Sequence, residues 1–191
     1  VDMLLSCKAM NLGIRLLYQY FSKDTEPLGK IIIGSIQNDL HEFGKNIVKM
    51  MLECAGFTVI DLGVDTMPFQ FINAFYDNPD TKIICCSCTV FDPIHNIVSM
   101  IKSLYRYQIT NHLNILNKIK LMIGGQALTE TYCQKLPTLI VESITNDTEF
   151  VEILKKTNQS LPNISIFNNI YYAQDAFLAV QKAKELVGKS N

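Results

Sequence analysis

The sequence has no marked excess of charge of either sign and no long hydrophobic run. Of its 191 residues, 17 are lysine or arginine and 18 are aspartate or glutamate, so the formal net charge at pH 7 is −1. Because there is no basic stripe or lysine-rich tail, nucleic acid is not expected as the main partner. The longest apolar runs, such as residues 82–90, are far shorter than a bilayer span. No membrane partner is therefore expected either.

A secretion signal and a disulfide framework are also missing. Lys8 and Arg15 interrupt the apolar stretch near the start, and there is no basic segment before it, so the pattern is not that of a signal peptide. Three of the six cysteines fall within one apolar run, residues 82–90, where they are expected as small buried side chains. These absences predict a cytoplasmic protein.

The sequence does contain an alternation of short apolar strands with amphipathic helices. At 48% hydrophobic and 18% charged residues, the chain has ample material for a buried core. The pattern predicts strands at 30–35, 58–62, 82–90 and 120–123, and helices ending at Gly56 and spanning 68–76, 94–107 and 175–187. Such alternation is typical of right-handed βαβ units. It predicts an α/β fold, Rossmann-like or flavodoxin-like, with a parallel sheet and helices on both faces.

The segment before the first strand has a different pattern. Residues 2–23 place apolar side chains at helical spacing, and a polar stretch with Pro27 separates them from the first strand. We therefore expect two parts, a helix with its linker at 1–27 and the α/β domain at 28–191. Residues 108–118 and 135–165 are less regular. There we expect elaborated loops or an extra helix at 150–156.

The loop after the first predicted strand combines a carboxylate, an imidazole and a glycine. Ligands of doubly wound sheets bind beyond the carboxyl ends of the strands, which is where this loop lies. Asp39 and His41 are two residues apart in it, so the carboxylate can reach the imidazole. A carboxylate bonded to one ring nitrogen fixes the tautomer and raises the basicity of the other, as at histidine metal ligands. Gly44 leaves room for a bulky group to approach the backbone.

Two further strand ends supply hydroxyls and glycines. Ser87 and Thr89 stand near the end of one strand, and Gly124 and Gly125 end the next. Together the three loops predict one imidazole beside a slot that is floored by glycines and lined with hydroxyls. Each feature also has a simpler interpretation. His41 could be a loop histidine with an ordinary hydrogen bond, and Asp39 a helix N-cap. The hydroxyls could be ordinary polar residues at a strand end, and the two glycines a strand-to-helix turn.

In this order, the three motifs resemble the signature of cobalamin-binding domains. That signature is DxHxxG, SxL and GG, and this chain has Asp39-x-His41-x-x-Gly44, Ser87-x-Thr89 and Gly124-Gly125. The resemblance is closest to the corrinoid proteins of methyltransferase systems, and it extends through residues 45–65 and to 172–176. The resemblance covers roughly residues 3–130 and 168–188. One such motif alone is weak evidence, whereas three in order at strand ends are specific.

The resemblance implies a cobalamin cofactor that the chain holds through one metal ligand. His41 would ligate the cobalt from below in place of the cofactor's dimethylbenzimidazole, and the nucleotide tail would enter a deep slot beside the sheet. Tyr172 and Ala173 would close the far wall of that slot. The residues assigned to cofactor binding are Asp39, Leu40, His41, Glu42, Phe43, Gly44, Ser87, Thr89, Gly124, Gly125, Tyr172 and Ala173.

The sequence departs from the family's pattern at three points. Thr89 stands where the second motif usually ends in leucine. Residues 91–93, Phe-Asp-Pro, stand where the family often has a hydroxyl that completes a proton relay, so the resemblance does not carry that relay over. Finally, the family has a four-helix cap above the corrin, and residues 2–23 resemble only its last helix. Residues 1–27 are accordingly interpreted as a remnant of that cap and a linker.

The function implied is that of a corrinoid carrier, which is not itself a complete enzyme. Its partners would be a donor-side and an acceptor-side methyltransferase subunit, between which it shuttles a methyl group. The apolar stripe of Leu5, Leu12 and Leu16 also raises a homo-oligomer as a partner.

Three other classes of protein remain open at this stage. The small subunit of an adenosylcobalamin-dependent mutase shares the motif, although residues 45–65 match the methyl carriers more closely. A cobalamin-based sensor or regulator is a second alternative, against which the lack of a basic patch counts. A flavodoxin-like protein without cobalamin would leave the coincidence of three motifs unexplained.

Overall fold

Five parallel strands form one sheet in the computed structural model, which describes residues 5, 9, 12, 13, 26–90, 93–114 and 116–188. The strands are β1 (Lys30–Ser35), β2 (Thr58–Asp61), β3 (Thr81–Ser87), β4 (Lys120–Gly124) and β5 (Ile170–Tyr172). Their order in the sheet is β2-β1-β3-β4-β5, and every neighbouring pair is parallel. The chain leaves β1 in one direction to β2 and returns to its other side at β3. The topological switch point therefore lies between β1 and β3.

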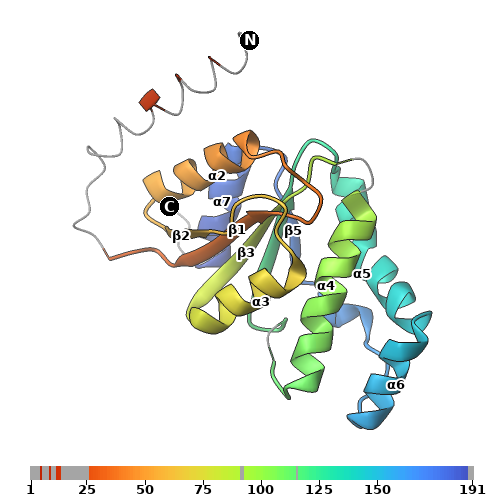
Figure 1. Ribbon diagram of the computed structural model, residues 1–191. Helices are drawn as coiled ribbons and strands as arrows, with labels where there is room; N and C mark the ends of the chain where they lie inside the picture. The colour runs from red at the N-terminus through yellow and green to blue at the C-terminus, as the bar shows by residue number, and fades with distance from the viewer. Residues whose placement is uncertain are drawn as a thin grey trace.

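Helices cover both faces of this sheet (Figure 1). Helices α2 (Phe43–Cys54) and α7 (Ala176–Leu186) pack together on one face. Helices α3 (Pro68–Asp77), α4 (Pro93–Thr110) and α5 (Glu130–Thr145) lie on the other, with α6 (Thr148–Lys156) packed beyond α5. A short 3₁₀ helix, Ile164–Phe167, precedes β5. This arrangement confirms the predicted α/β fold with a parallel sheet.

The alternation of side chains along the strands divides the core into two clusters. Ile32 belongs to a large cluster with residues of α3, α4, α5 and α6, which includes the fully buried Phe150 and Phe167. Ile31 and Ile33 belong to a smaller cluster beneath α2 and α7. The two faces of the sheet are thus filled very differently.

Three elements differ from what the sequence predicts, and one of them is the short strand β5, which none of the four predicted strand ranges includes. Strand β3 ends at Ser87 rather than at residue 90, because its neighbour β4 ends at Gly124 and the chain leaves the ladder beside it. Helix α5 occupies part of the segment expected to be irregular, with Pro137 inside it. Its apolar stripe, buried on the core, outweighs the hydrogen bond that this proline removes. The extra helix expected at 150–156 is present as α6.

Only four residues of the helix expected at 2–23 are described, namely positions 5, 9, 12 and 13, and all four are helical. Leu5 and Leu12 are 59% and 62% exposed. Leu16 lies outside the described residues, as do Phe91 and Asp92. Within the described part of the chain, no helix combines the length and apolarity needed to cross a membrane.

Candidate cofactor site

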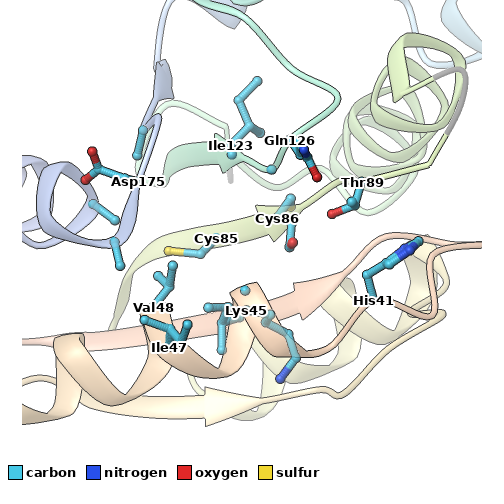
Figure 2. Close-up of a pocket in the computed structure, with 18 of the residues that line it drawn as sticks. His41, Lys45, Ile47, Val48, Cys85, Cys86, Thr89, Ile123, Gln126 and Asp175 are labelled. Atoms are coloured by element: carbon cyan, nitrogen blue, oxygen red, sulfur yellow. The ribbon is translucent and has the colours of Figure 1, made fainter. Parts of the chain in front are cut away.

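A cavity of about 790 Å³ lies between helices α2 and α7 and the carboxyl-terminal half of the central strands. Figure 2 shows Ile47 and Val48 of α2 on one side of it and Cys85 of β3 on the other. The volume falls within the range of cofactor pockets, and most of the lining is apolar. The His41 loop, which follows the carboxyl end of β1, forms part of the cavity lining.

The floor of the cavity depends on two consecutive glycines. A Cβ atom at Gly124 would lie 2.6 Å from the carbonyl oxygen of Ala173 on the neighbouring chain segment. Gly125 has φ +123°, and a Cβ atom there would lie 2.1 Å from the carbonyl oxygen of Cys88. No side chain fits at either position, so backbone packs directly on backbone at the end of β4. These glycines are structurally required whether or not they contact a ligand.

His41 stands at the mouth of the cavity, where Asp39 holds its ring. The Nδ1 atom of His41 lies 2.8 Å from Oδ1 of Asp39, and the same oxygen accepts a hydrogen bond from the His41 backbone N–H at 2.9 Å. The other oxygen, Oδ2, accepts from the backbone N–H of Thr89 at 2.5 Å. The Asp39 side chain is fully buried, whereas that of His41 is 66% exposed. The carboxylate therefore fixes the base of an imidazole whose far edge is open.

This geometry determines which ring nitrogen can bind a metal. As an ionised carboxylate, Asp39 can only accept hydrogen bonds, so Nδ1 of His41 carries the proton and donates. The lone pair is then on Nε2, at the exposed edge of the ring. A hydrogen-bonded carboxylate increases the basicity of that lone pair, as it does at histidine metal ligands. The simpler interpretation of Asp39 as a helix N-cap is wrong, because Glu42 occupies the N-cap position of α2.

A metal ion at His41 would have to bring most of its own ligands. Among the described residues, no group of three or more histidine, cysteine, aspartate or glutamate side chains could hold a metal ion. A corrinoid would satisfy this condition, because it brings its own ring ligands for the cobalt and needs only one ligand from the chain. The deep apolar cavity beside a single imidazole thus fits a large metal macrocycle with a long tail.

The cysteines of β3 do not add a second metal centre. Cys85 packs in the cluster under α2 and α7, whereas Cys86 and Cys88 belong to the cluster on the other face. Burial raises the pKa of the Cys85 and Cys86 thiols well above the usual range. They therefore stay protonated and serve as small apolar side chains.

The structure brings most of the residues predicted for the site to this cavity. Of the twelve, those that line it are His41, Glu42, Phe43, Gly44, Ser87, Thr89, Gly124, Gly125 and Ala173. Asp39 lies behind His41, and Leu40 is 73% exposed beside it. Tyr172 instead packs against the opposite core cluster, and its hydroxyl donates to the carbonyl oxygen of Leu128 at 3.1 Å. The cofactor contacts of these residues stay predictions.

Several lining residues were not singled out from the sequence. They include Ile47 and Val48 of α2, Gln126 after β4, and Asp175, which caps α7 by accepting from the Leu178 backbone N–H. The helical spacing of Ile47 and Val48 indicates an inward face, but it does not distinguish a packed core from a cavity wall. Gln126 follows a predicted strand end, which was its only signal. Asp175 begins the predicted helix and lies within 172–176, a segment of the family resemblance that assigned it no role.

Lys45 lines the cavity with its aliphatic stem and places its charge elsewhere. The side chain is 2% exposed, and its Nζ donates to Oδ1 of Asp61 at 2.6 Å, on the side of β2. Figure 2 shows the amine turned away from the cavity. Partial burial by itself would raise the pKa of Asp61, but the hydrogen bond from Lys45 and the nearby Lys49 hold it below its usual value. The pair fastens the first turn of α2 to the edge strand.

Comparison with known proteins points to the same cofactor as the geometry of the cavity. The sequence profile of the B12 binding domain matches residues 29–164. The chain is 32% identical to trimethylamine corrinoid protein 1 of Methanosarcina mazei over 136 residues, which are 70% of this chain and 60% of that protein. The chain thus spans about 60% of the length of the curated relatives it matches.

Two solved structures share the fold at low sequence identity. The monomethylamine corrinoid protein of Methanosarcina barkeri aligns with a TM-score of 0.63 and 18% identity, covering 96% of this chain and 69% of that one. The methanol:cobalamin methyltransferase complex MtaBC of the same organism aligns with a TM-score of 0.58 and 18% identity, covering 98% and 57%. At this identity the likeness concerns the fold. Because the family profile covers most of the sequence, including the His41 loop and both glycines, the chain belongs to the B12 binding domain family, whose cofactor is a corrinoid.

Proposed function

We propose that this chain is a corrinoid carrier that presents one cobalt to two methyltransferase partners in turn, a donor-side and an acceptor-side subunit. The observation that carries the proposal is the Asp39–His41 pair at the mouth of the cavity, which leaves Nε2 of His41 as a single exposed metal ligand. The bound corrinoid supplies a nucleophilic cobalt that can accept and release a methyl group. The names of the curated relatives, corrinoid proteins for methylamines, support the methyltransferase setting.

The residues of the chain bind the cofactor and leave the reaction to its exposed side. His41 would hold the cobalt through Nε2, and Asp39 keeps the imidazole in the tautomer that leaves this nitrogen free to bind a metal. The cavity between α2 and α7 takes the nucleotide tail, with Ser87 and Thr89 near its entrance. Apolar walls exclude water from the tail. In this proposal the partners supply the donor and acceptor sites, while the organometallic chemistry belongs to the cofactor.

We further propose that the chain consists of two parts and that the protein lies in the cytoplasm. In this division, residues 28–191 would form the cobalamin-binding domain, and residues 1–27 would belong to a cap helix and linker. The exposed Leu5 and Leu12 would contact a further subunit or a second copy of the chain. The buried free thiols of β3 agree with a reducing cytoplasm.

The ligand role of His41 is tested by spectroscopy. Wild-type protein loaded with cobalamin should give a base-off complex with one histidine nitrogen on the cobalt, visible as nitrogen hyperfine splitting in the Co(II) EPR spectrum. His41→Ala should lose this splitting and bind cobalamin much more weakly. The control is His112→Asn, which removes an exposed imidazole at the far end of α4 and keeps a residue that tolerates φ +53°. Unchanged splitting in His41→Ala would falsify ligation.

The carrier role is tested against the mutase alternative with two forms of the cofactor. Alone, the loaded protein should turn over no methyl donor, whereas after reduction it should accept a methyl group from methyl iodide. It should then release that group to a thiol or a pterin only when a cognate methyltransferase is added. Clear preference for adenosylcobalamin, with carbon-skeleton rearrangement on addition of a large barrel subunit, would replace the carrier role with the mutase role and leave His41 ligation intact.

A further inference from the structure

The loop that carries His41 is held by a second loop, which follows the edge strand β2. The backbone N–H of Asp65 donates to the carbonyl oxygen of Asp39 at 2.9 Å, and Oδ1 of Asp65 accepts from the backbone N–H of Asn38 at 2.7 Å. One residue of the second loop therefore contacts the backbone of two consecutive residues of the first, through the N–H of Asn38 and the carbonyl oxygen of Asp39. Only Leu40 separates these two residues from His41.

The gripped segment has an unfavourable backbone conformation. Asn38 has φ +66° and Asp65 has φ +51°, so each adopts the left-handed region without being glycine. Asparagine and aspartate tolerate this region better than most residues, although it still carries strain of about 1 kcal/mol. A strained segment keeps one geometry only where its surroundings hold it. The two hydrogen bonds of Asp65 hold this segment on the side away from β3, next to the bridge between Ile36 and Thr66.

The opposite side of the His41 loop is anchored separately. The fully buried Ser35 donates from its hydroxyl to the carbonyl oxygen of His41 at 2.9 Å. Thr89 donates its backbone N–H to the Asp39 carboxylate at 2.5 Å. Asp65 thus completes a bracket, because Asp39 is held by its carbonyl oxygen from one loop and by its carboxylate from another. Rotation of the Asp39 peptide would move the carboxylate away from the His41 ring.

We propose, on the basis that His41 ligates the cobalt as proposed above, that Asp65 is a positioning residue for this ligand. Through the Asn38 and Asp39 peptide groups it fixes the carboxylate that orients the imidazole, so that Nε2 faces the corrinoid before the cofactor arrives. Asp65 itself is exposed and does not line the cavity. Its effect on the cobalt is therefore indirect, through His41.

The test compares two substitutions at one position. Asp65→Gly removes the carboxylate acceptor, keeps the backbone N–H, and adopts the left-handed conformation without steric strain. Asp65→Asn keeps a side-chain oxygen as acceptor and also tolerates this conformation. Asp147→Gly is the control for loss of a carboxylate that accepts a backbone N–H. Asp147 accepts from Phe150 at the distant α6 and also pairs with Lys102, so this control removes at least as much away from the His41 loop. All three proteins are loaded with cobalamin in the Co(II) state.

We expect Asp65→Gly to bind cobalamin roughly tenfold more weakly and to show a reduced fraction of histidine-ligated cobalt by EPR, the scale of second-shell losses. Asp65→Asn should stay close to wild type, and Asp147→Gly should match wild type in both measurements. In the cofactor-free proteins, amide hydrogen exchange at residues 36–42 should be faster in Asp65→Gly alone. These measurements separate positioning from general stability, because a substitution that only destabilises the protein lowers its unfolding temperature without changing the fraction of histidine-ligated cobalt.

Two outcomes would overturn the positioning role. One is an Asp65→Gly protein with the wild-type ligated fraction and affinity. The other is an Asp65→Asn protein that is impaired as much as Asp65→Gly. Failure of the ligation proposal is recognised independently, because then His41→Ala leaves the nitrogen hyperfine splitting of the cobalt unchanged.

Discussion

The two faces of the sheet differ in how completely they are filled. On one face, helices α3, α4, α5 and α6 bury large side chains, among them Phe71, Phe150 and Phe167, in a continuous core. On the other, α2 and α7 cover a smaller cluster that includes Ala173, Ala179 and Ala183 and a single phenylalanine, and a cavity of about 790 Å³ remains. The buried charged side chains of the described part of the chain, Asp39 and Lys45, also lie on the cavity side.

This difference separates stability from function within one small domain. Protein interiors are normally packed at the density of organic crystals, so a large apolar void is unfavourable unless a ligand occupies it. We therefore expect the filled face to supply most of the stability of the sheet, and the hollow face to contribute less. Substitutions on the two faces should therefore have different consequences, and the following experiments test that expectation.

The largest effect is expected from emptying the filled face. Phe150 is fully buried, and its ring stacks on that of Tyr105 with centroids 5.9 Å apart. Phe150→Ala should lower the free energy of unfolding by about 3–5 kcal/mol, measured by urea denaturation of the cofactor-free protein. The affinity of the remaining folded protein for cobalamin should not change. A loss below about 1 kcal/mol would mean that the filled face is not the stabilising one.

A second, smaller effect is expected from the carboxylate behind the ligand. Asp39 receives hydrogen bonds only from N–H groups, two from His41 and one from Thr89. In Asp39→Asn, the amide NH₂ must face one of these donors, which disrupts the bracket. Cobalamin affinity measured by titration should fall roughly 10–100-fold. Equal affinity and an equal Co(II)/Co(I) potential in the variant would show that this carboxylate does not act on the ligand.

Adding the same bulk to each face should sharpen the comparison. Ile97 is fully buried on the filled face, and Ile97→Phe should destabilise the protein by about 1–3 kcal/mol through overpacking. Val48 faces the cavity, so Val48→Phe should leave unfolding within about 1 kcal/mol of wild type and instead weaken cobalamin binding about tenfold. Equal destabilisation by both substitutions would indicate that the cavity closes in the cofactor-free protein.

The smallest effect concerns a carboxyl group on the cavity-side helix α2. Burial, followed by the charge of Asp61, raises the pKa of Glu53 from 4.5 to about 7. The folded protein then holds this proton more tightly than the unfolded chain, so the contribution to stability is full below pH 4.5 and is lost as the pH rises through about 7. After allowance for solvent screening, the loss is on the order of 1 kcal/mol.

The Glu53→Gln protein should lack this dependence. Urea denaturation at several pH values between 4.5 and 8 should show wild type losing stability relative to the variant as the pH rises. Parallel curves for the two proteins would contradict the raised pKa. The buried Oε2 of Glu53, which has no hydrogen-bond partner, agrees with a neutral carboxyl group at this position.

The sequence predicts the scaffold better than it predicts the void. The alternation of strands and helices follows from local periodicity. The end of α2 is also predictable, because helices commonly end just before a glycine in the left-handed conformation, here Gly56 with φ +97°. Helix α5 was missed because Pro137 and the polar residues around it obscured the helical spacing of Cys133, Leu136 and Ile140. That spacing was the signal that could have found it.

The candidate site divides in the same way. The contact between Asp39 and His41 could be predicted, since it joins residues two apart in one loop. The bracket from Asp65 could not, because it depends on how the β2 loop meets the His41 loop in three dimensions. Tyr172 and Ala173 illustrate a further limit: neighbours on a strand face opposite sides, and only Ala173 reaches the cavity.

The walls of the cavity come from opposite ends of the domain. Helix α2 follows the first strand, whereas Ala173 and α7 are among the last parts of the domain to be made. During synthesis on the ribosome, β1, the His41 loop and α2 emerge more than one hundred residues before α7. The cavity cannot form completely until α7 has left the exit tunnel, because α7 supplies part of its lining. Before that point, the cavity lacks the wall that Ala173 and α7 supply.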